Sequence, residues 1–121
     1  MREVYTNGGY TSGLFYNERN DQMLLRQYGR LCCISLDGQG IYTYDILGNE
    51  GLAVDRQGHA YISGYQSNDI QRLSPDGTFR DIVLNERDGI DRPWGIAYNK
   101  DFTKLFVISR IGESVLIYSC K

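Results

Sequence analysis

The sequence has little of what most catalytic or membrane-bound proteins display. No uninterrupted apolar stretch approaches the ~18 residues of a membrane-spanning helix. There is one histidine, and Cys32, Cys33 and Cys120 have neither the even count of a disulfide framework nor the spacing of a zinc site. Thirteen basic residues against 15 acidic ones give a net charge of −2, which argues against a strongly basic nucleic-acid binder. We therefore expect a cytoplasmic chain in a reducing setting, with no cofactor and no membrane partner.

Glycine, by contrast, is plentiful. It accounts for 14 of the 121 residues, where an average composition gives roughly 8. Ten tyrosines and many β-branched residues lie in short runs between these glycines. Short aromatic and β-branched runs bounded by glycine are typical of antiparallel strands, and the length suits one domain.

A repeated pattern organises these runs. Three segments open alike, and their first glycines are 38 and 44 positions apart: Gly13–Asn17, Gly51–Asp55 and Gly95–Asn99. Each is followed by a polar turn and two further apolar runs: 23–25 and 31–35, 60–62 and 70–74, 105–108 and 115–119. The first two copies then carry an Asp-Gly turn and a fourth run, at 41–44 and 79–84.

Four short strands in each ~40–45 residues predict the blades of a β-propeller. The predicted fold is all-β, with four-stranded antiparallel blades at approximately 13–46, 51–84 and 95–121. Residues 1–12, with an early strand at 3–6, are predicted to be the remnant of a preceding blade. The alternatives are an all-β sandwich with coincidental spacing, and a local helix over Asp21–Arg30, where Met23, Leu24, Gln27 and Tyr28 would share a face. The register of the repeats favours strands over this helix.

The second and third copies resemble NHL repeats. The resemblance rests on Gly51–Asp55, Gly58, Tyr61-Ile62, Asn68, Ile70-Gln71 and Ser74–Gly77, and a further repeat starts at Pro93–Ala97. The resemblance covers roughly residues 12 to 121. Within this family, the chain is most similar to the propeller at the C-terminus of tripartite-motif (TRIM-NHL) proteins. This similarity implies a six-bladed ring that binds protein or RNA, attached to a RING-type ubiquitin ligase. NHL repeats usually have an Asp after the second strand and an Arg before the third, which tie neighbouring elements together. These two positions hold Gly64 and Asp69 in the second copy, and Ser109 and Ser114 in the third.

The resemblance implies that this chain supplies about three of six blades. We expect it to be the C-terminal part of a longer protein, or a half-ring that pairs with another copy. Since the third copy has no fourth run, Val115–Tyr118 is predicted to be a bare apolar edge. The sequence thus predicts self-association through the uncovered blade faces and this edge.

Candidate catalytic groups are few, and we expect the chain not to be an enzyme. His59 lies in a turn, where a structural role is the simpler interpretation, and no Gly-x-Ser-x-Gly motif occurs. The aspartates Asp37, Asp76 and Asp88 each precede glycine, which is turn chemistry. Some similar propellers are metal-dependent lyases or hydrolases, but their ligand histidines have no counterpart here.

Binding through loops is the predicted function. In a propeller, the loops joining strand 2 to strand 3, and strand 4 to the next blade, line one face. That face would carry the predicted partner-binding residues Glu50, Tyr65, Gln66, Asn68, Arg92, Trp94 and Arg110. Tryptophan, tyrosine and arginine are enriched in protein-binding hot spots, so a protein partner is predicted. As alternatives to a binding role, Trp94 would plug the mouth of the central channel of the propeller, and Tyr65 would pack between loops. RNA is the second candidate ligand, since Arg outnumbers Lys by 10 to 3.

Overall fold

The computed structural model describes residues 3, 10–48 and 50–120. These residues form eleven β-strands and one short 3₁₀ helix, η1 (Glu86–Asp88). The first four strands are β1 (Thr11–Asn17), β2 (Gln22–Gln27), β3 (Arg30–Ser35) and β4 (Gly40–Asp45). The next four are β5 (Leu52–Val54), β6 (Ala60–Gly64), β7 (Asp69–Leu73) and β8 (Phe79–Leu84). The last three are β9 (Ile96–Tyr98), β10 (Lys104–Ser109) and β11 (Ser114–Ser119).

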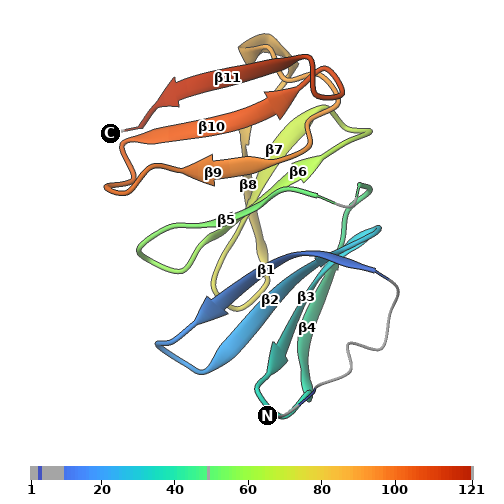
Figure 1. The fold of residues 1–121 in the computed structure, drawn as a ribbon, viewed down its shortest axis with the longest axis vertical. Helices are drawn as coiled ribbons and strands as arrows, with labels where there is room; N and C mark the ends of the chain where they lie inside the picture. The colour runs from blue at the N-terminus through green and yellow to red at the C-terminus, as the bar shows by residue number, and fades with distance from the viewer. Residues whose placement is uncertain (1–2, 4–9, 49, 121) are drawn as a thin grey trace.

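The strands form three antiparallel sheets, which we call blade 1 (β1–β4), blade 2 (β5–β8) and blade 3 (β9–β11). Within each blade the strands pair in chain order, so every connection is a hairpin. Figure 1 shows the blades stacked in sequence along the long axis of the molecule, with the C-terminal blade at one end. The predicted all-β class is confirmed, and the fourth strands predicted at 41–44 and 79–84 are present as β4 and β8.

The segment for which a helix was the alternative is extended. Met23, Leu24 and Leu25 lie in β2, between β1 and β3. Neighbouring residues of a strand point to opposite faces, and both Leu24 and Leu25 are buried. Blade 1 therefore has apolar residues on both faces, which the helical interpretation did not anticipate. The strand predicted at 3–6 lies largely outside the described residues.

The core consists of apolar layers between blades. One cluster joins Leu24, Leu31 and Cys33 of blade 1 to Ile62 and Leu73 of blade 2. A second joins the opposite face of blade 2 to blade 3, through Tyr61, Ile70, Ile96, Leu105 and Val107. Blade 2 is thus covered on both faces, and burial of these layers is the main driving force for the stacking.

The first strands β1, β5 and β9 lie beside one another where the blades come closest (Figure 1). Gly51, just before β5, has φ +100°, a conformation that side chains other than hydrogen rarely adopt. A Cβ at Gly51 would collide with Ser63 Oγ and with the backbone oxygen of Trp94. Glycine is therefore required where the three blades converge.

No helix that could span a bilayer occurs in residues 10–48 and 50–120.

We predict that Gly51→Ala lowers the free energy of unfolding by about 3 kcal/mol, because it combines a positive φ with a collision against backbone. The matched control is Gly40→Ala: an added Cβ there meets nothing within 4 Å, and the φ of Gly40 is not in the left-handed region. Urea unfolding of both variants measures the difference. Equal stabilities of the two variants would contradict the packing described for Gly51.

Tyr42 packs in the layer between blades 1 and 2, against Gly77. Burial raises its pKa well above the usual 10. A raised folded-state pKa stabilises the fold below about pH 10, and this contribution is lost as the pH rises further. We therefore predict that the wild type loses more stability between pH 8 and about pH 11 than Tyr42→Phe does, by a several-fold change in the unfolding equilibrium constant. Urea titrations at the two pH values measure this, and parallel losses in both proteins would refute it.

Candidate functional site

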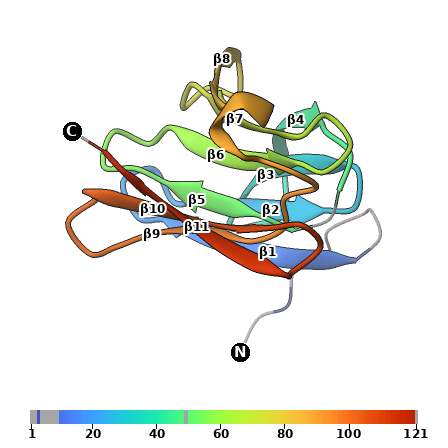
Figure 2. The same cartoon turned by 90° about the horizontal axis from the view of Figure 1, so that it is seen from above.

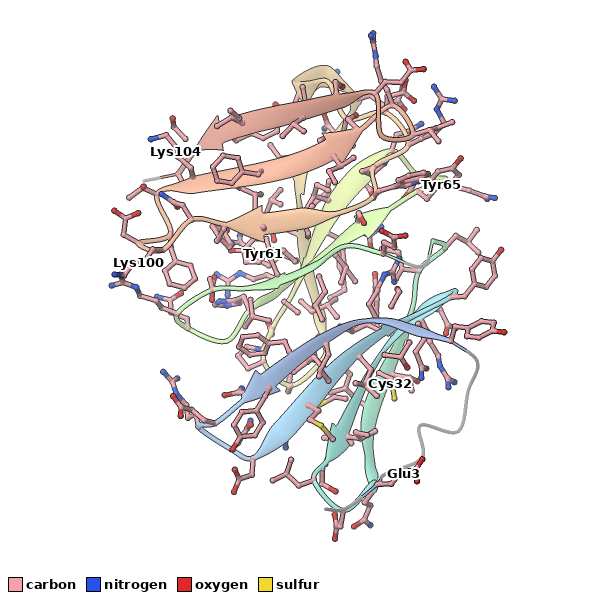
Figure 3. The ribbon with its side chains drawn as sticks, in the orientation of Figure 1. Glu3, Cys32, Tyr61, Tyr65, Lys100 and Lys104 are labelled. Atoms are coloured by element: carbon pink, nitrogen blue, oxygen red, sulfur yellow. The ribbon has the colours of Figure 1, made fainter. Side chains whose placement is uncertain are left out.

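One side of the molecule is formed by the turns that join strand 2 to strand 3 and each blade to the next. We call this side the loop face; its segments are 28–29, 46–48, 50–51, 65–68, 85–95 and 110–113. Figure 3 shows Tyr65 on this side, whereas Lys100 and Lys104 lie at the opposite ends of the strands. Turns from all three blades therefore meet on one surface.

A hollow of about 320 Å³ lies on the loop face, and its lining comes from the β2–β3 turn, the β6–β7 turn and the two connections between blades. Four of the seven predicted binding residues line it: Glu50, Tyr65, Gln66 and Trp94. The other lining residues, none of which was predicted to bind, are Tyr28, Leu47, Gly48 and Pro93. Tyr28 is 72% exposed, so two tyrosines and a tryptophan surround the same hollow. The structure thus brings together residues that are far apart in sequence.

The remaining three predicted residues border this hollow without lining it. The backbone N–H of Arg92 donates to Asn68 Oδ1 at 2.8 Å, which ties the 85–95 loop to the 65–68 turn. The Arg110 N–H donates to the backbone oxygen of Asp91 at 2.6 Å. Asn68, Arg92 and Arg110 all have positive φ values, between 45° and 55°. Their backbones therefore shape the loops beside the hollow.

The Arg92 guanidinium is already paired. Its Nε donates to Asp91 Oδ1 at 2.8 Å and its Nη2 to Asp91 Oδ2 at 3.2 Å. These hydrogen bonds raise the pKa of Arg92 and lower that of Asp91. Both side chains are exposed, so solvent weakens the attraction between them. The Arg92–Asp91 pair nevertheless has no net charge. Arg92 consequently attracts an anion more weakly than an unpaired arginine would.

Trp94 holds the blades through its backbone and presents its side chain to the hollow. Its N–H donates to the Ile108 oxygen at 2.8 Å, and its own oxygen lies 2.6 Å from Ser63 Oγ. The Glu50 oxygen is also 2.6 Å from Ser63 Oγ, so one hydroxyl joins the entries to blades 2 and 3. The half-buried indole lies over Gly112. Removing the indole would therefore leave these backbone links in place.

Arg26, which was not among the predicted binding residues, lies below the hollow. It is 0% exposed, its Nη2 donates to the Ser63 oxygen at 3.1 Å, and its Nε lies 3.4 Å from the Glu50 oxygen. Nη1 has no hydrogen-bond partner among the residues that the structure describes, and burial lowers the pKa of Arg26 to about 10. The sequence contains one signal that could have identified Arg26. It directly follows Leu24 and Leu25, at a repeat position where the other copies have Ser63 and Ile108. Arg26 supports the floor of the hollow from beneath.

A second hollow, of about 480 Å³, lies between blades 2 and 3 and away from the predicted residues. Part of its polar lining is internally bonded. Tyr61 donates its hydroxyl to Asp55 Oδ2 at 2.9 Å, and Arg72 forms two hydrogen bonds with Asp81. The bonds to Asp81 raise the pKa of Arg72 and lower that of Asp81. This network links strands within blade 2.

The single histidine lies at the edge of that network. His59 Nδ1 is 3.3 Å from Asp55 Oδ2 without meeting hydrogen-bond geometry, and Nε2 is 3.2 Å from Arg80 Nη1. Asp55 Oδ1 accepts the backbone N–H groups of Gln57 and His59, which shapes the turn. Among the described residues, no group of three His, Cys, Asp or Glu side chains is arranged to hold a metal ion.

The comparisons with known proteins identify a fold. No family model and no curated protein sequence matches the chain. Among solved structures, the chain is similar to the crystal structure of selenomethionine-substituted virginiamycin B lyase from Staphylococcus aureus, a β-propeller protein. The TM-score is 0.61 at 14% identity, over 90% of this chain and 41% of the lyase. The chain therefore has a β-propeller fold and spans less than half the length of that protein.

This comparison corrects one prediction. The expectation that the chain is not an enzyme is contradicted, because the protein that shares its fold is itself a lyase. The few candidate catalytic side chains in the sequence did not justify that exclusion. At 14% identity the likeness shows the fold alone, and assigns this chain no activity.

Proposed function

We propose that the chain binds a protein partner through the hollow on the loop face. The observation that carries the proposal is the convergence of Tyr28, Tyr65 and Trp94, with Glu50 and Gln66, around one hollow. Partly exposed aromatic rings contribute large contact areas at low entropic cost, and neighbouring polar groups supply specificity. The hollow is supported by backbone links between blades, which favours a preformed site.

The residues around the hollow favour protein over RNA. Phosphate recognition needs unpaired cations, whereas Arg92 is paired with Asp91 and the hollow itself is lined by the acidic Glu50. Arg110 remains exposed beside it. The phosphates of an RNA ligand would have to lie near the carboxylates of Glu50 and Asp91, which would repel them. A protein ligand that presents an apolar or amphipathic side chain fits the aromatic walls better.

The resemblance to TRIM-NHL proteins supplies the finer proposal. In that setting the chain would act as the substrate-recognition end of a RING-type ubiquitin ligase. The NHL and TRIM assignments rest on sequence motifs such as Gly51–Asp55 and Pro93–Ala97, and no family model supports them. The loop-face proposal does not depend on this setting.

We predict that Trp94→Ala and Tyr65→Ala each lower partner capture at least about tenfold, which is typical of hot-spot truncation. The chain should remain folded, because Trp94 links the blades through its backbone. The matched control is Phe79→Ala, an exposed aromatic on β8 that does not line the hollow. Immobilised protein and quantitative mass spectrometry of captured proteins give the measurement, with circular dichroism to confirm folding.

Salt dependence separates the two ligand classes in the same experiment. Capture through aromatic contacts should change little as the salt concentration rises, whereas RNA held through phosphates should be released steeply. An unchanged capture profile for the Trp94→Ala, Tyr65→Ala double variant would reject the loop-face site. Ribonuclease-sensitive capture with a steep salt dependence would replace the protein partner with RNA.

A further inference from the structure

The hollow on the loop face presents aromatic rings and one carboxylate to a ligand. Figure 2 shows the turns that follow β2, β6 and β10 on one side of the stack of blades, opposite the C-terminus. Tyr28, Tyr65 and Trp94 contribute the rings, and Glu50 is the only charged residue among the described residues that line the hollow. The face of an aromatic ring carries a partial negative charge. The groups that a ligand can contact are therefore suited to a positive charge.

The three rings of the hollow are not engaged with a cation or with another ring. Elsewhere in this chain a cation does lie over a ring, since the Arg56 guanidinium is 5.3 Å from the centroid of Phe102. In the part of the chain that the structure describes, no arginine and no second ring makes such a contact with Tyr28, Tyr65 or Trp94. A cation from outside the chain can therefore lie over these rings without displacing one of its own.

The Glu50 carboxylate is likewise not used by the fold. The fold uses the backbone oxygen of Glu50, which lies 2.6 Å from Ser63 Oγ and 3.4 Å from Arg26 Nε. Glu50 itself is exposed, and none of the ion pairs among the described residues includes it. A carboxylate beside three ring faces is a combination that attracts a cation.

The charges around the hollow also favour a cation. The segments of the loop face hold five acidic residues and three basic ones: Glu50, Glu86, Asp88, Asp91 and Glu113, and Arg87, Arg92 and Arg110. None of these arginines lines the hollow. Asp91 is paired with Arg92, and both Arg92 and Arg110 lower its pKa. A fourth arginine, Arg26, lies beneath Gly48 but is 0% exposed. The charge that a ligand in the hollow can contact is therefore negative.

We propose that the hollow holds a basic side chain of the partner protein, lysine or arginine, with its charged end against the three rings and Glu50. This inference rests on the proposed protein-binding site and adds what that site recognises. Lysine and arginine have an apolar stem below the charged end, and the stem suits Leu47 and Pro93, which also line the hollow. A carboxylate in the same place would meet Glu50 and the negative faces of the rings.

Trp94 is the only tryptophan of the chain, so its fluorescence reports on the hollow directly. The probes are lysine and arginine blocked as N-acetyl methylamides, and the control is blocked norleucine, which has a neutral stem of similar length. At constant ionic strength, at least one basic probe should change the fluorescence saturably and bind about fivefold more tightly than norleucine. The lysine and arginine titrations show which of the two side chains the hollow prefers. Equal responses to the basic probes and norleucine, or no saturable response to either basic probe, would overturn the proposal.

Glu50→Gln isolates the carboxylate, because it removes the charge and keeps the size of the side chain. It should weaken the preferred basic probe about fivefold and leave norleucine unchanged. The matched control is Glu86→Gln, which removes an exposed carboxylate of the loop face that does not line the hollow and should change neither. Circular dichroism of both variants verifies folding. Equal weakening by the two variants would mean that the general charge of the loop face attracts the probes, which would overturn the hollow as their site.

Partner capture by Glu50→Gln separates this inference from the proposed function. Capture that is lost in the Trp94→Ala, Tyr65→Ala double variant and lowered several-fold in Glu50→Gln supports both. Capture that is lost in the double variant and complete in Glu50→Gln keeps the loop-face site and rejects the basic side chain. Normal capture by the double variant rejects the site itself, and with it this inference.

Discussion

The structure depends on covering the apolar faces of its blades. Each blade is a single thin sheet, and one sheet has no interior of its own, so its side chains leave water only when another sheet packs against it. Blade 2 meets this requirement on both faces, through Leu73 on one side and Ile70 on the other. The blades therefore stabilise one another, and loss of one layer weakens the whole stack rather than a single element.

The same packing sets the geometry of the loop face. The Ser63 hydroxyl touches the backbone oxygens of Glu50 and Trp94, which are the residues at the entries to blades 2 and 3. Gly51 leaves space for this contact. The floor of the hollow is thus made of backbone groups fixed by blade stacking, while its walls are side chains that can vary. A rigid floor with variable walls suits recognition, since specificity can change without loss of the fold.

The sequence was informative where the physics is local. Alternation of apolar residues with Asp-Gly turns, as at Gly38 and Gly77, specifies strands and hairpins over a few residues, and the strand assignment of Met23–Leu25 was correct for this reason. Arg26 was missed because its burial depends on Glu50 and Ser63, 24 and 37 positions away. The pairing of Arg92 with Asp91 was missed because the backbone at Arg92 turns into a left-handed conformation, which no residue type there announces.

The fold is compatible with both catalysis and recognition, so the side chains alone distinguish the two. In the hollow between blades 2 and 3, the charged side chains are already engaged: Tyr61 donates to Asp55, and Arg72 is held by Asp81. Substrate chemistry at these groups would require breaking those bonds. On the loop face, the Trp94 indole and the Tyr28 ring are instead partly accessible and pack mainly against loop residues. Accessible aromatic area that the fold does not need has more to gain from a partner than a satisfied polar network has, which supports the proposed recognition on the loop face.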